Sequence, residues 1–471
     1  MPIATSPVAK PNLANLPKSS ILRLYDPATQ GNSFSLDGFP ALKEGKEWQT
    51  RLVDIIENWG AAGMTTNQTL FRQLTDAGVL DVRLRGLKAQ GKSASEIYWF
   101  LYNEAAIEAA KIFSPLHARW PSEGRVSQEA SAMLTEKEPL VRDVLRISKS
   151  MQGQGVGTFT KIPNITVGPQ AIQEAVGSDV PLNPNITLVF SDRHYLQTVE
   201  GYLLGLERKS KTLKDLGQIY SVNSLFVSRV DRAVDPMIDE ALANASEEST
   251  RQRLVLLNGK TAVAQAKKVY QMFEAIFLGA PFEDPEGIYQ DEEGKKMAAA
   301  IDRLRTLFAK LKGLGAHPQR LLIASSGVKS DQPYSPLLYL LPFLGPWSAN
   351  TAPEGTLEAT SRFVAGLSDE QVSSIKKRNI MREPLPAIPA DIKPISEWDR
   401  AILMTAQERQ QAGIQSITPD QILRDVDRLV LQSKGTSLRA ICDTIRDKGA
   451  ASFTADEQAT LQSIETKLAA L

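Results

Sequence analysis

The stretch Val156-Gly-Thr-Phe-Thr-Lys-Ile162 is the part of the chain from which its fold is most readily inferred. Its apolar and β-branched residues predict a buried strand, and the Pro-Asn turn and helix-like segment that follow are typical of an α/β fold. Lys161 stands near the end of this strand, where desolvation of an ammonium is costly. Desolvation also lowers the pKa of an amine toward the range in which it attacks a carbonyl. Schiff-base chemistry is therefore the first hypothesis for Lys161, and a structural salt bridge is the alternative.

Short β-branched segments alternate with long helical segments on both sides of Lys161, from about residue 21 to about residue 370. This alternation predicts an α/β protein with the (β/α)8 TIM-barrel fold. The eight strand candidates are Ile21 to Tyr25, Ala61 to Thr66, Arg125 to Ala130, Gly157 to Ile162, Asn185 to Phe190, Val222 to Ser228, Arg320 to Ser325 and Ser348 to Thr351.

The segment from Thr261 to Phe277 illustrates the helices expected around the barrel. Its apolar residues recur at helical spacing, while Gln265, Lys267 and Lys268 fall on the opposite face. We therefore expect an outer helix whose polar face points to solvent.

The chain changes character between Arg382 and Pro394, where four prolines exclude a regular helix. Helical patterns resume afterwards, and Thr418 and Thr454 each carry the sequence signals of a helix start. The predicted organisation is an N-terminal arm (1–20), the barrel (21–380), a Pro-rich linker (381–395) and a C-terminal α-helical extension (396–471).

Composition limits the partners and the location of the protein. Lys plus Arg and Asp plus Glu are both 54, so no global field favours nucleic acid or an acidic membrane surface. No apolar run approaches the length of about 20 residues that a membrane-spanning helix needs. The single cysteine, Cys442, and an N-terminus without an apolar signal segment indicate a cytoplasmic protein. The three histidines are far apart in the sequence, and we expect no metal site.

Polar residues cluster at the predicted carboxyl ends of the strands, where barrel enzymes place their working groups. An amine, a carboxylate, hydroxyls, amides and two further cations are therefore expected to converge at one mouth. These residues are Asn67, Glu129, Lys161, Asn185, Thr187, Ser224, Arg229, Ser325 and Lys329.

The sequence motifs around these residues resemble those of the transaldolase family, whose members form Schiff bases. The resemblance covers about 300 residues and depends on seven motifs in the same order. They are Gly63-Met-Thr-Thr-Asn-Gln-Thr-Leu-Phe71, Gly124-Arg-Val-Ser-Gln-Glu129, Thr160-Lys-Ile-Pro163, Asn185-Ile-Thr-Leu-Val-Phe-Ser191, Ser224-Leu-Phe-Val-Ser-Arg-Val-Asp231, Ala324-Ser-Ser-Gly-Val-Lys329 and Asn350-Thr-Ala-Pro-Glu354.

The resemblance implies that Lys161 attacks the ketose carbonyl and that the iminium allows the C3–C4 bond to break. Glu129 would move protons through a water held by Thr187. Asn67 and Asn185 would bind substrate hydroxyls, although Asn67 also suits the N-cap of a following helix.

The same resemblance assigns the phosphate of the substrate to Ser224, Arg229, Ser325 and Lys329. Many family members carry an arginine two residues after the serine that corresponds to Ser325, and this chain has Gly327 there. Lys329 would then act as a point charge, and Arg229 could instead pair with a nearby aspartate.

The first strand is where the sequence departs most from the family, whose members end this strand with an acid/base aspartate. Asp26 follows the segment predicted as the strand, whereas Asp37 better fits the family's spacing to Asn67. The strand assignment favours Asp26, and Asp37 is the alternative.

The resemblance predicts a transaldolase that transfers a dihydroxyacetone unit from sedoheptulose 7-phosphate or fructose 6-phosphate to glyceraldehyde 3-phosphate or erythrose 4-phosphate, with no cofactor. A lyase similar to fructose-6-phosphate aldolase and a catalytically weak phosphosugar-binding protein are the alternatives. The expected partners are sugar phosphates, with no nucleic acid and no membrane, and a homodimer stays open.

Overall fold

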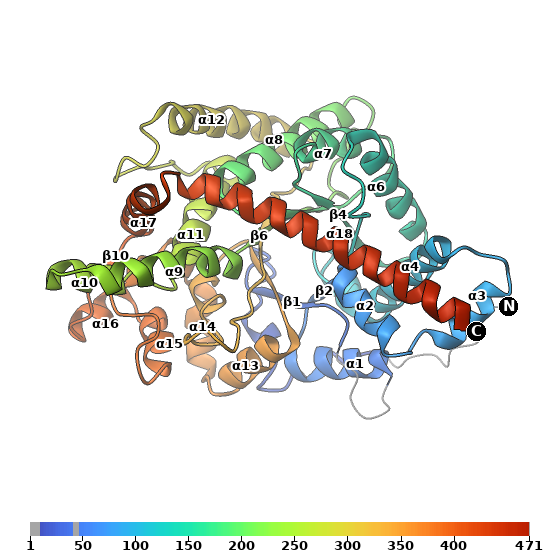
Figure 1. The fold of residues 1–471 in the computed structure, drawn as a ribbon, viewed down its shortest axis with the longest axis horizontal. Helices are drawn as coiled ribbons and strands as arrows, with labels where there is room; N and C mark the ends of the chain where they lie inside the picture. Colours follow the sequence, from blue (N-terminus) through green and yellow to red (C-terminus); the bar gives the residue numbers. More distant parts are fainter. Residues whose placement is uncertain (1–9, 41–46, 471) are drawn as a thin grey trace.

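Eight parallel strands close into a barrel in chain order, each hydrogen-bonded to the next and the last to the first (Figure 1). This computed structural model describes residues 10–40 and 47–470, so residues 1–9 of the predicted N-terminal arm lie outside it. The strands are β1 (Ser33–Asp37), β2 (Gly63–Thr65), β3 (Arg125–Glu129), β4 (Gly157–Pro163), β5 (Pro184–Val189), β6 (Val222–Phe226), β7 (Arg320–Ala324) and β8 (Ser348–Ala352).

Helices follow the strands and surround them, which confirms the predicted (β/α)8 barrel (Figure 1). Their bounds are α1 (Trp48–Trp59), α2 (Gln68–Asp76), α3 (Asp81–Lys88), α4 (Ala94–Ile112), α5 (Ser114–Arg119), α6 (Lys137–Met151), α7 (Gly168–Val176), α8 (Asp192–Lys209), α9 (Ser228–Asn244), α10 (Glu248–Val255), α11 (Thr261–Phe273), α12 (Glu292–Lys312), α13 (Glu354–Ala365), α14 (Asp369–Lys377), α15 (Ser396–Leu403), α16 (Ala406–Gln411), α17 (Pro419–Lys434) and α18 (Leu438–Ala470). Shorter elements are η1 (Ile21–Leu24), η2 (Glu274–Leu278), η3 (Leu341–Phe343), η4 (Ile380–Arg382), β9 (Leu385–Pro386) and β10 (Ser416–Ile417).

The predicted first strand, Ile21 to Tyr25, is wrong. Residues Ile21–Leu24 form a short 3-10 helix whose apolar side chains are buried, and the strand is Ser33–Asp37. In β1 only Phe34 and Leu36 are apolar, and Ser33 and Ser35 line the barrel interior together with Glu123, Arg125 and Arg320. The apolar segment therefore packs outside the barrel, and the more polar segment is the strand.

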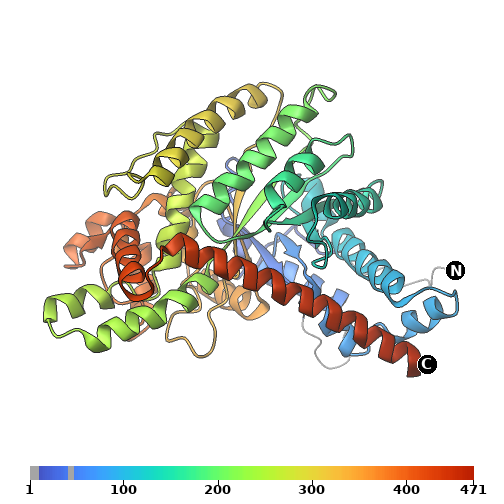
Figure 2. The ribbon, with the colours of Figure 1, turned by 45° about the horizontal axis from the view of Figure 1, so that its top comes forward.

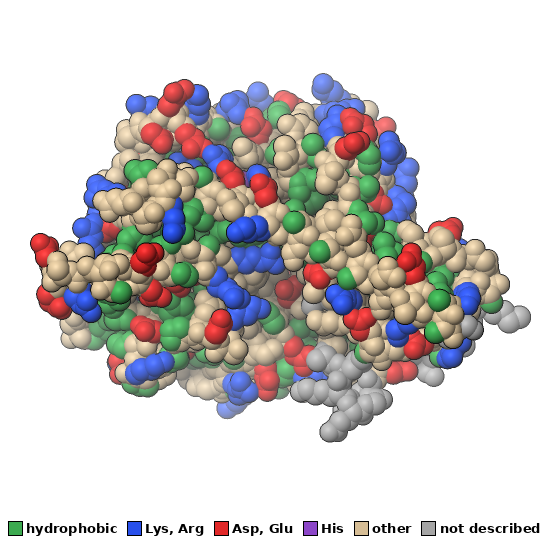
Figure 3. Space-filling model, viewed as in Figure 1, with side chains coloured by type: hydrophobic (Ala, Val, Ile, Leu, Met, Phe, Trp, Pro, Cys, Tyr) green, Lys and Arg blue, Asp and Glu red, His purple; other side chains and the backbone are tan. Residues whose placement is uncertain are grey.

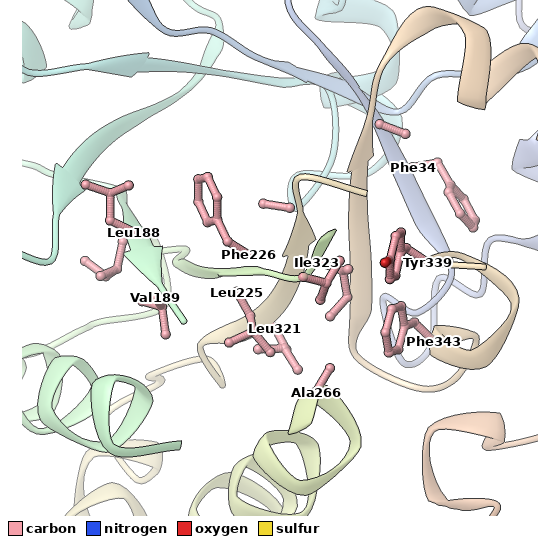
Figure 4. Close-up of a cluster of buried hydrophobic side chains, with 14 of the residues drawn as sticks. Phe34, Leu188, Val189, Leu225, Phe226, Ala266, Leu321, Ile323, Tyr339 and Phe343 are labelled. Carbon is pink, nitrogen blue, oxygen red and sulfur yellow. The ribbon is translucent and has the colours of Figure 1, made fainter. Parts of the chain in front are cut away.

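Alternating residues of each strand divide the core into two parts. On β7, Leu321 and Ile323 point outward and join the main core between strands and helices, where Ala266 of α11 lies opposite them (Figure 4). Leu322 of the same strand belongs to a small inner cluster with Phe159 and two other interior side chains. The barrel interior is thus filled by side chains.

The polar face of α11 does not point to solvent as the spacing predicts. The Nζ of Lys267 donates to the backbone carbonyls of Ile380 and Glu383, and the Nζ of Lys268 lies 2.9 Å from an Asp420 carboxylate oxygen. Both lysine side chains are buried because α17 and the segment around η4 pack against α11. Burial lowers the pKa of Lys267 to about 7.

The C-terminal part of the chain is helical, with one correction to the predicted starts. The Thr418 hydroxyl accepts the N–H of Gln421 and caps α17, as predicted. The predicted start at Thr454 is wrong, because α18 runs unbroken from Leu438 to Ala470. The Thr454 hydroxyl instead donates to the carbonyl of Ala132, in the loop after β3.

The Pro-rich segment contains β9, which pairs in antiparallel fashion with β10. Helix α18 crosses the barrel and contacts α2, α4, α9 and β5, so it lies over the carboxyl ends of the strands (Figures 1 and 2). Within residues 10–40 and 47–470, no helix is long and apolar enough to cross a membrane.

Candidate active site

Lys161 projects from the end of β4 into the barrel mouth. Its side chain is only 6% exposed, and its Nζ donates to the carbonyl of Thr66 at 3.0 Å. The same Nζ lies 3.2 Å from Oε2 of Glu129, because the parallel register sets Glu129 of β3 directly beside Lys161. The structure therefore brings the predicted amine and carboxylate into one buried pair.

Glu129 lies in a setting that favours its protonated form. Burial raises the pKa of its carboxyl, and the opposing charge of Lys161 limits the rise. Repulsion from Asp37 adds to the rise, and the positive charge of Arg229 opposes it. A carboxyl of raised pKa next to an amine is suited to proton transfer.

Thr187 lies on the strand next to Lys161 and faces the same side. Thr187 aligns with Pro163 of β4, which is two positions beyond Lys161. Because residues two apart on a strand face the same side, the side chains of Thr187 and Lys161 both point into the barrel. Its hydroxyl is buried and has no hydrogen-bond partner within the described part of the chain. Such a hydroxyl is available to a water or a substrate.

The amide of Asn185 is fixed by two neighbours inside the barrel. Its oxygen accepts from the Ser224 hydroxyl at 2.6 Å, and its nitrogen donates to the Ser127 hydroxyl at 3.0 Å. Ser224 is therefore engaged with Asn185 and not with the cations of the predicted phosphate pocket. Asn67 directly precedes α2, and its carbonyl accepts the N–H of Phe71 in the first turn.

The predicted strand that would place Asp26 at the barrel mouth does not form, because Ile21–Leu24 are a 3-10 helix. Asp26 lies in a turn, where its carboxylate accepts from the backbone N–H of Ala28 and the hydroxyl of Thr29. Asp37 ends β1 instead, and its Oδ1 accepts from the Thr65 hydroxyl at 2.8 Å. The charge of Asp37 acts on both Glu129 and Arg229, so Asp37 is the first-strand carboxylate at the mouth.

Arg229 opens α9 and offers a cation to the mouth. Its guanidinium carbon lies 5.5 Å from the ring centre of Phe226. The two aspartates that follow it on α9 are bonded elsewhere, Asp231 to the Tyr339 hydroxyl and Asp235 to the Tyr334 hydroxyl. Burial lowers the pKa of Arg229, and the negative charges of Asp37, Glu129 and Asp456 oppose this change.

The other two predicted phosphate ligands, Ser325 and Lys329, differ in their surroundings. The Ser325 hydroxyl lies 3.0 Å from that of Ser228, the residue before Arg229, so Ser325 stands near that cation. Ser325 has a positive φ of 55°, which turns the chain sharply after β7. Lys329 is exposed, and its amine makes no hydrogen bond or ion pair with the described residues.

Sequence reasoning missed the contribution of α18 to this mouth. Phe453 of α18 places its ring centre 5.6 Å from the guanidinium carbon of Arg229. On the face that α18 crosses, acidic and basic side chains are interspersed (Figure 3). Within the described residues, no group of three His, Cys, Asp or Glu residues could hold a metal ion.

The fold and this mouth define a (β/α)8-barrel protein with a buried lysine equipped for imine chemistry. The model of the family "Transaldolase/Fructose-6-phosphate aldolase" matches residues 48–421, and the chain belongs to that family. The chain is 32% identical over 312 residues to "Transaldolase 2" of Streptomyces coelicolor, covering 66% of this chain and 73% of that protein. It is 32% identical over 324 residues to "Transaldolase" of Saccharopolyspora erythraea, covering 68% and 77%. With "Transaldolase" of Trichodesmium erythraeum it shares 30% over 312 residues, covering 65% and 74%.

Proposed function

We propose that the protein is a transaldolase that moves a dihydroxyacetone unit between sugar phosphates through a Schiff base on Lys161. The observation that carries the proposal is the buried amine of Lys161, 3.2 Å from the buried carboxyl of Glu129 at the barrel mouth. The relatives named transaldolase support the same activity. Donors would be sedoheptulose 7-phosphate or fructose 6-phosphate, and acceptors glyceraldehyde 3-phosphate or erythrose 4-phosphate.

The first half of the reaction forms the imine. Neutral Lys161 adds to the ketose carbonyl, and the resulting carbinolamine loses its hydroxyl as water after Glu129 supplies a proton. The raised pKa of Glu129 supports this role, because a protonated carboxyl is the acid that the step needs. The unpartnered hydroxyl of Thr187 supports its role in holding the water through which the proton passes.

The second half breaks the carbon–carbon bond. Asp37 takes the proton of the C4 hydroxyl, the C3–C4 electron pair moves into the iminium, and an aldose leaves. The enamine that remains then attacks the carbonyl of the acceptor aldose, and the steps run in reverse. Asp37 replaces Asp26 in this proposal because Asp37 ends β1 at the mouth.

Phosphate binding is assigned to Arg229 together with the neighbouring hydroxyls of Ser228 and Ser325. The guanidinium held between the rings of Phe226 and Phe453, and the hydroxyl pair at the residue before it, support this assignment. Lys329 is exposed and is retained only as an outer cation. Asn185 and Asn67 are retained as ligands of substrate hydroxyls.

A lyase activity is the second candidate, because the matched family includes fructose-6-phosphate aldolases. In that case the enamine carbon would take up a proton, and a water would then hydrolyse the resulting imine on Lys161, so that free dihydroxyacetone and the lysine amine are released. The identity of the acceptor separates the two reactions.

Three further features belong to the proposal. A cytoplasmic location follows from a single cysteine, which cannot form an internal disulfide. The division into a barrel (21–380), a linker (381–395) and a helical extension (396–471) is retained, and a homodimer remains open.

Borohydride trapping tests the proposed chemistry. Wild-type protein incubated with fructose 6-phosphate and borohydride should gain the mass of a reduced three-carbon or six-carbon adduct, whereas Lys161→Met should gain none. Product analysis with and without erythrose 4-phosphate then distinguishes transfer from release of dihydroxyacetone. An unmodified wild-type mass would refute the imine.

A further inference from the structure

Helix α18 lies outside the segment that the family model matches, yet it covers the mouth of the barrel. The match ends at residue 421, and α18 begins at Leu438. It crosses from α9 to α2 over the carboxyl ends of the strands, touching β5 on the way (Figures 1 and 2). Its backbone comes so close that a Cβ at Gly449 would lie 3.0 Å from a guanidinium nitrogen of Arg229.

The first contact with the site is Phe453, which is 4% exposed. The guanidinium of Arg229 lies over the rings of both Phe226 of β6 and Phe453 of α18, at 5.5 and 5.6 Å. Ring faces attract a guanidinium and restrict its rotation while its N–H groups stay free for an anion. Phe453 thus fixes the cation proposed to bind phosphate.

The second contact is Glu457, one helical turn further along and fully buried. Its carboxylate accepts from the Ser131 hydroxyl at 2.8 Å and from the Ala132 N–H at 2.7 Å. Thr454 donates to the carbonyl of the same Ala132 at 2.7 Å. These bonds hold both sides of a peptide segment that begins directly after Glu129.

Three other bonds hold the start of this segment. The Ala130 N–H donates to the carbonyl of Lys161 at 3.3 Å, and the Ser131 N–H donates to the Asp143 carboxylate of α6 at 2.9 Å. The amide of Gln68, at the start of α2, donates to the carbonyl of Ala130 at 3.0 Å. Without Glu457 and Thr454, Ser131 and Ala132 would lose three hydrogen bonds, which would loosen the chain two residues after Glu129.

We propose that α18 completes the active site, with Glu457 as a positioning residue for Glu129 and Phe453 as a positioning residue for Arg229. This inference rests on the proposed transaldolase function for its kinetic readouts. The two residues act on different steps: Glu457 acts on proton transfer and therefore on kcat, and Phe453 acts on phosphate binding and therefore on KM.

The test uses full-length Glu457→Leu and Phe453→Leu, with Glu465→Gln as the control on the exposed face of the same helix. Glu457→Leu should lower kcat by about tenfold to a hundredfold, since a loss of about 1 Å in placement costs that much, with KM within twofold. Glu457→Gln, which keeps one acceptor, should recover part of the loss. Phe453→Leu should raise KM for fructose 6-phosphate about threefold and leave KM for unphosphorylated dihydroxyacetone unchanged.

Two readouts do not need turnover. Glu457→Leu should speed hydrogen exchange at the Ala132 amide, and Phe453→Leu should weaken binding of inorganic phosphate about threefold. Wild-type kinetics in both folded variants, or equal losses for phosphorylated and unphosphorylated substrates, would overturn the inference. If wild-type protein forms no borohydride adduct, the proposed function fails, and exchange and phosphate binding alone then decide for or against this role of α18.

Discussion

Replacing Lys161 by methionine should make the stability of the protein depend on the protonation of Glu129. The variant removes the cation that lies 3.2 Å from this carboxyl and leaves the carboxyl buried. In the wild type, the charge of Lys161 limits the rise in the pKa of Glu129, so its loss raises that pKa further. Breaking a buried pair in this way costs about 3–5 kcal/mol when the remaining charge cannot escape.

The sign of the pH dependence follows from proton counting. Above a pH of about 4.3 the unfolded chain ionises Glu129, while the folded variant keeps it protonated. The folded state then binds one more proton, and the free energy of unfolding falls by about 1.4 kcal/mol for each pH unit up to the folded pKa. Because the pKa of Glu129 is already raised in the wild type, the wild type shares part of this slope, and the variant should lose at most about 1.4 kcal/mol per pH unit more than the wild type.

Thermal unfolding followed by circular dichroism measures this difference. At about 2 °C per kcal/mol for a large chain, the variant's Tm should fall more steeply with pH than the wild-type Tm, by at most about 3 °C per pH unit. The double variant Lys161→Met/Glu129→Gln has no carboxyl to titrate and should lose this extra dependence. Parallel wild-type and Lys161→Met profiles would refute the coupling of the pair.

Three other predictions address the remaining assignments. Asp37→Asn should lower kcat at least about a hundredfold in a coupled transaldolase assay, whereas Asp26→Asn should stay within twofold; the reverse ranking would return the role to Asp26. Arg229→Ala should raise KM for fructose 6-phosphate more than tenfold with a smaller change in kcat, and an unchanged KM would remove it from the phosphate site. Burial lowers the pKa of Lys267 to about 7, so the unfolded state binds more protons than the folded state from pH 7 to 9. The free energy of unfolding of the wild type should therefore rise by up to about 1.4 kcal/mol per pH unit from this group. Lys267→Met should lose that rise in urea unfolding, and a pH profile identical to that of the wild type would contradict the prediction.

The pairing of Lys161 with Glu129 was predictable from the sequence because parallel strands bring their carboxyl ends to one edge. Once β3 and β4 were recognised as consecutive strands, the register left the two side chains as neighbours. The strands themselves were recognisable because their outward residues are apolar and buried. Local pattern and global topology agreed at these positions.

The first strand shows where this reasoning fails. An interior-facing barrel strand needs apolar residues only on its outer side, and Ser33, Ser35 and Asp37 alternate with just two of them. The more apolar segment at Ile21 was the better strand by composition, yet it packs as a 3-10 helix. Composition could not distinguish the two, because the polar interior is a property of the assembled barrel.

Burial by distant segments explains the other differences. Lys267 and Lys268 lie on a face that is polar in sequence, and only the docking of α17 and the segment at η4 buries it. Thr454 has the residues of a helix cap, but its hydroxyl bonds across to Ala132. Local signals cannot show which distant backbone group will be available as a partner.

The charges at the mouth indicate the state in which Glu129 begins the reaction. Arg229 is the cation at the mouth, and Asp37, Glu129 and Asp456 act on it as carboxylates. Since Lys161 must be neutral to attack a carbonyl, these carboxylates would outnumber the cation before a phosphate dianion entered. Protonation of the buried Glu129 reduces this excess of negative charge, and the approach of phosphate near Arg229 should raise the pKa of Glu129 further. Substrate binding would therefore supply Glu129 in the acid form that removal of the carbinolamine hydroxyl requires.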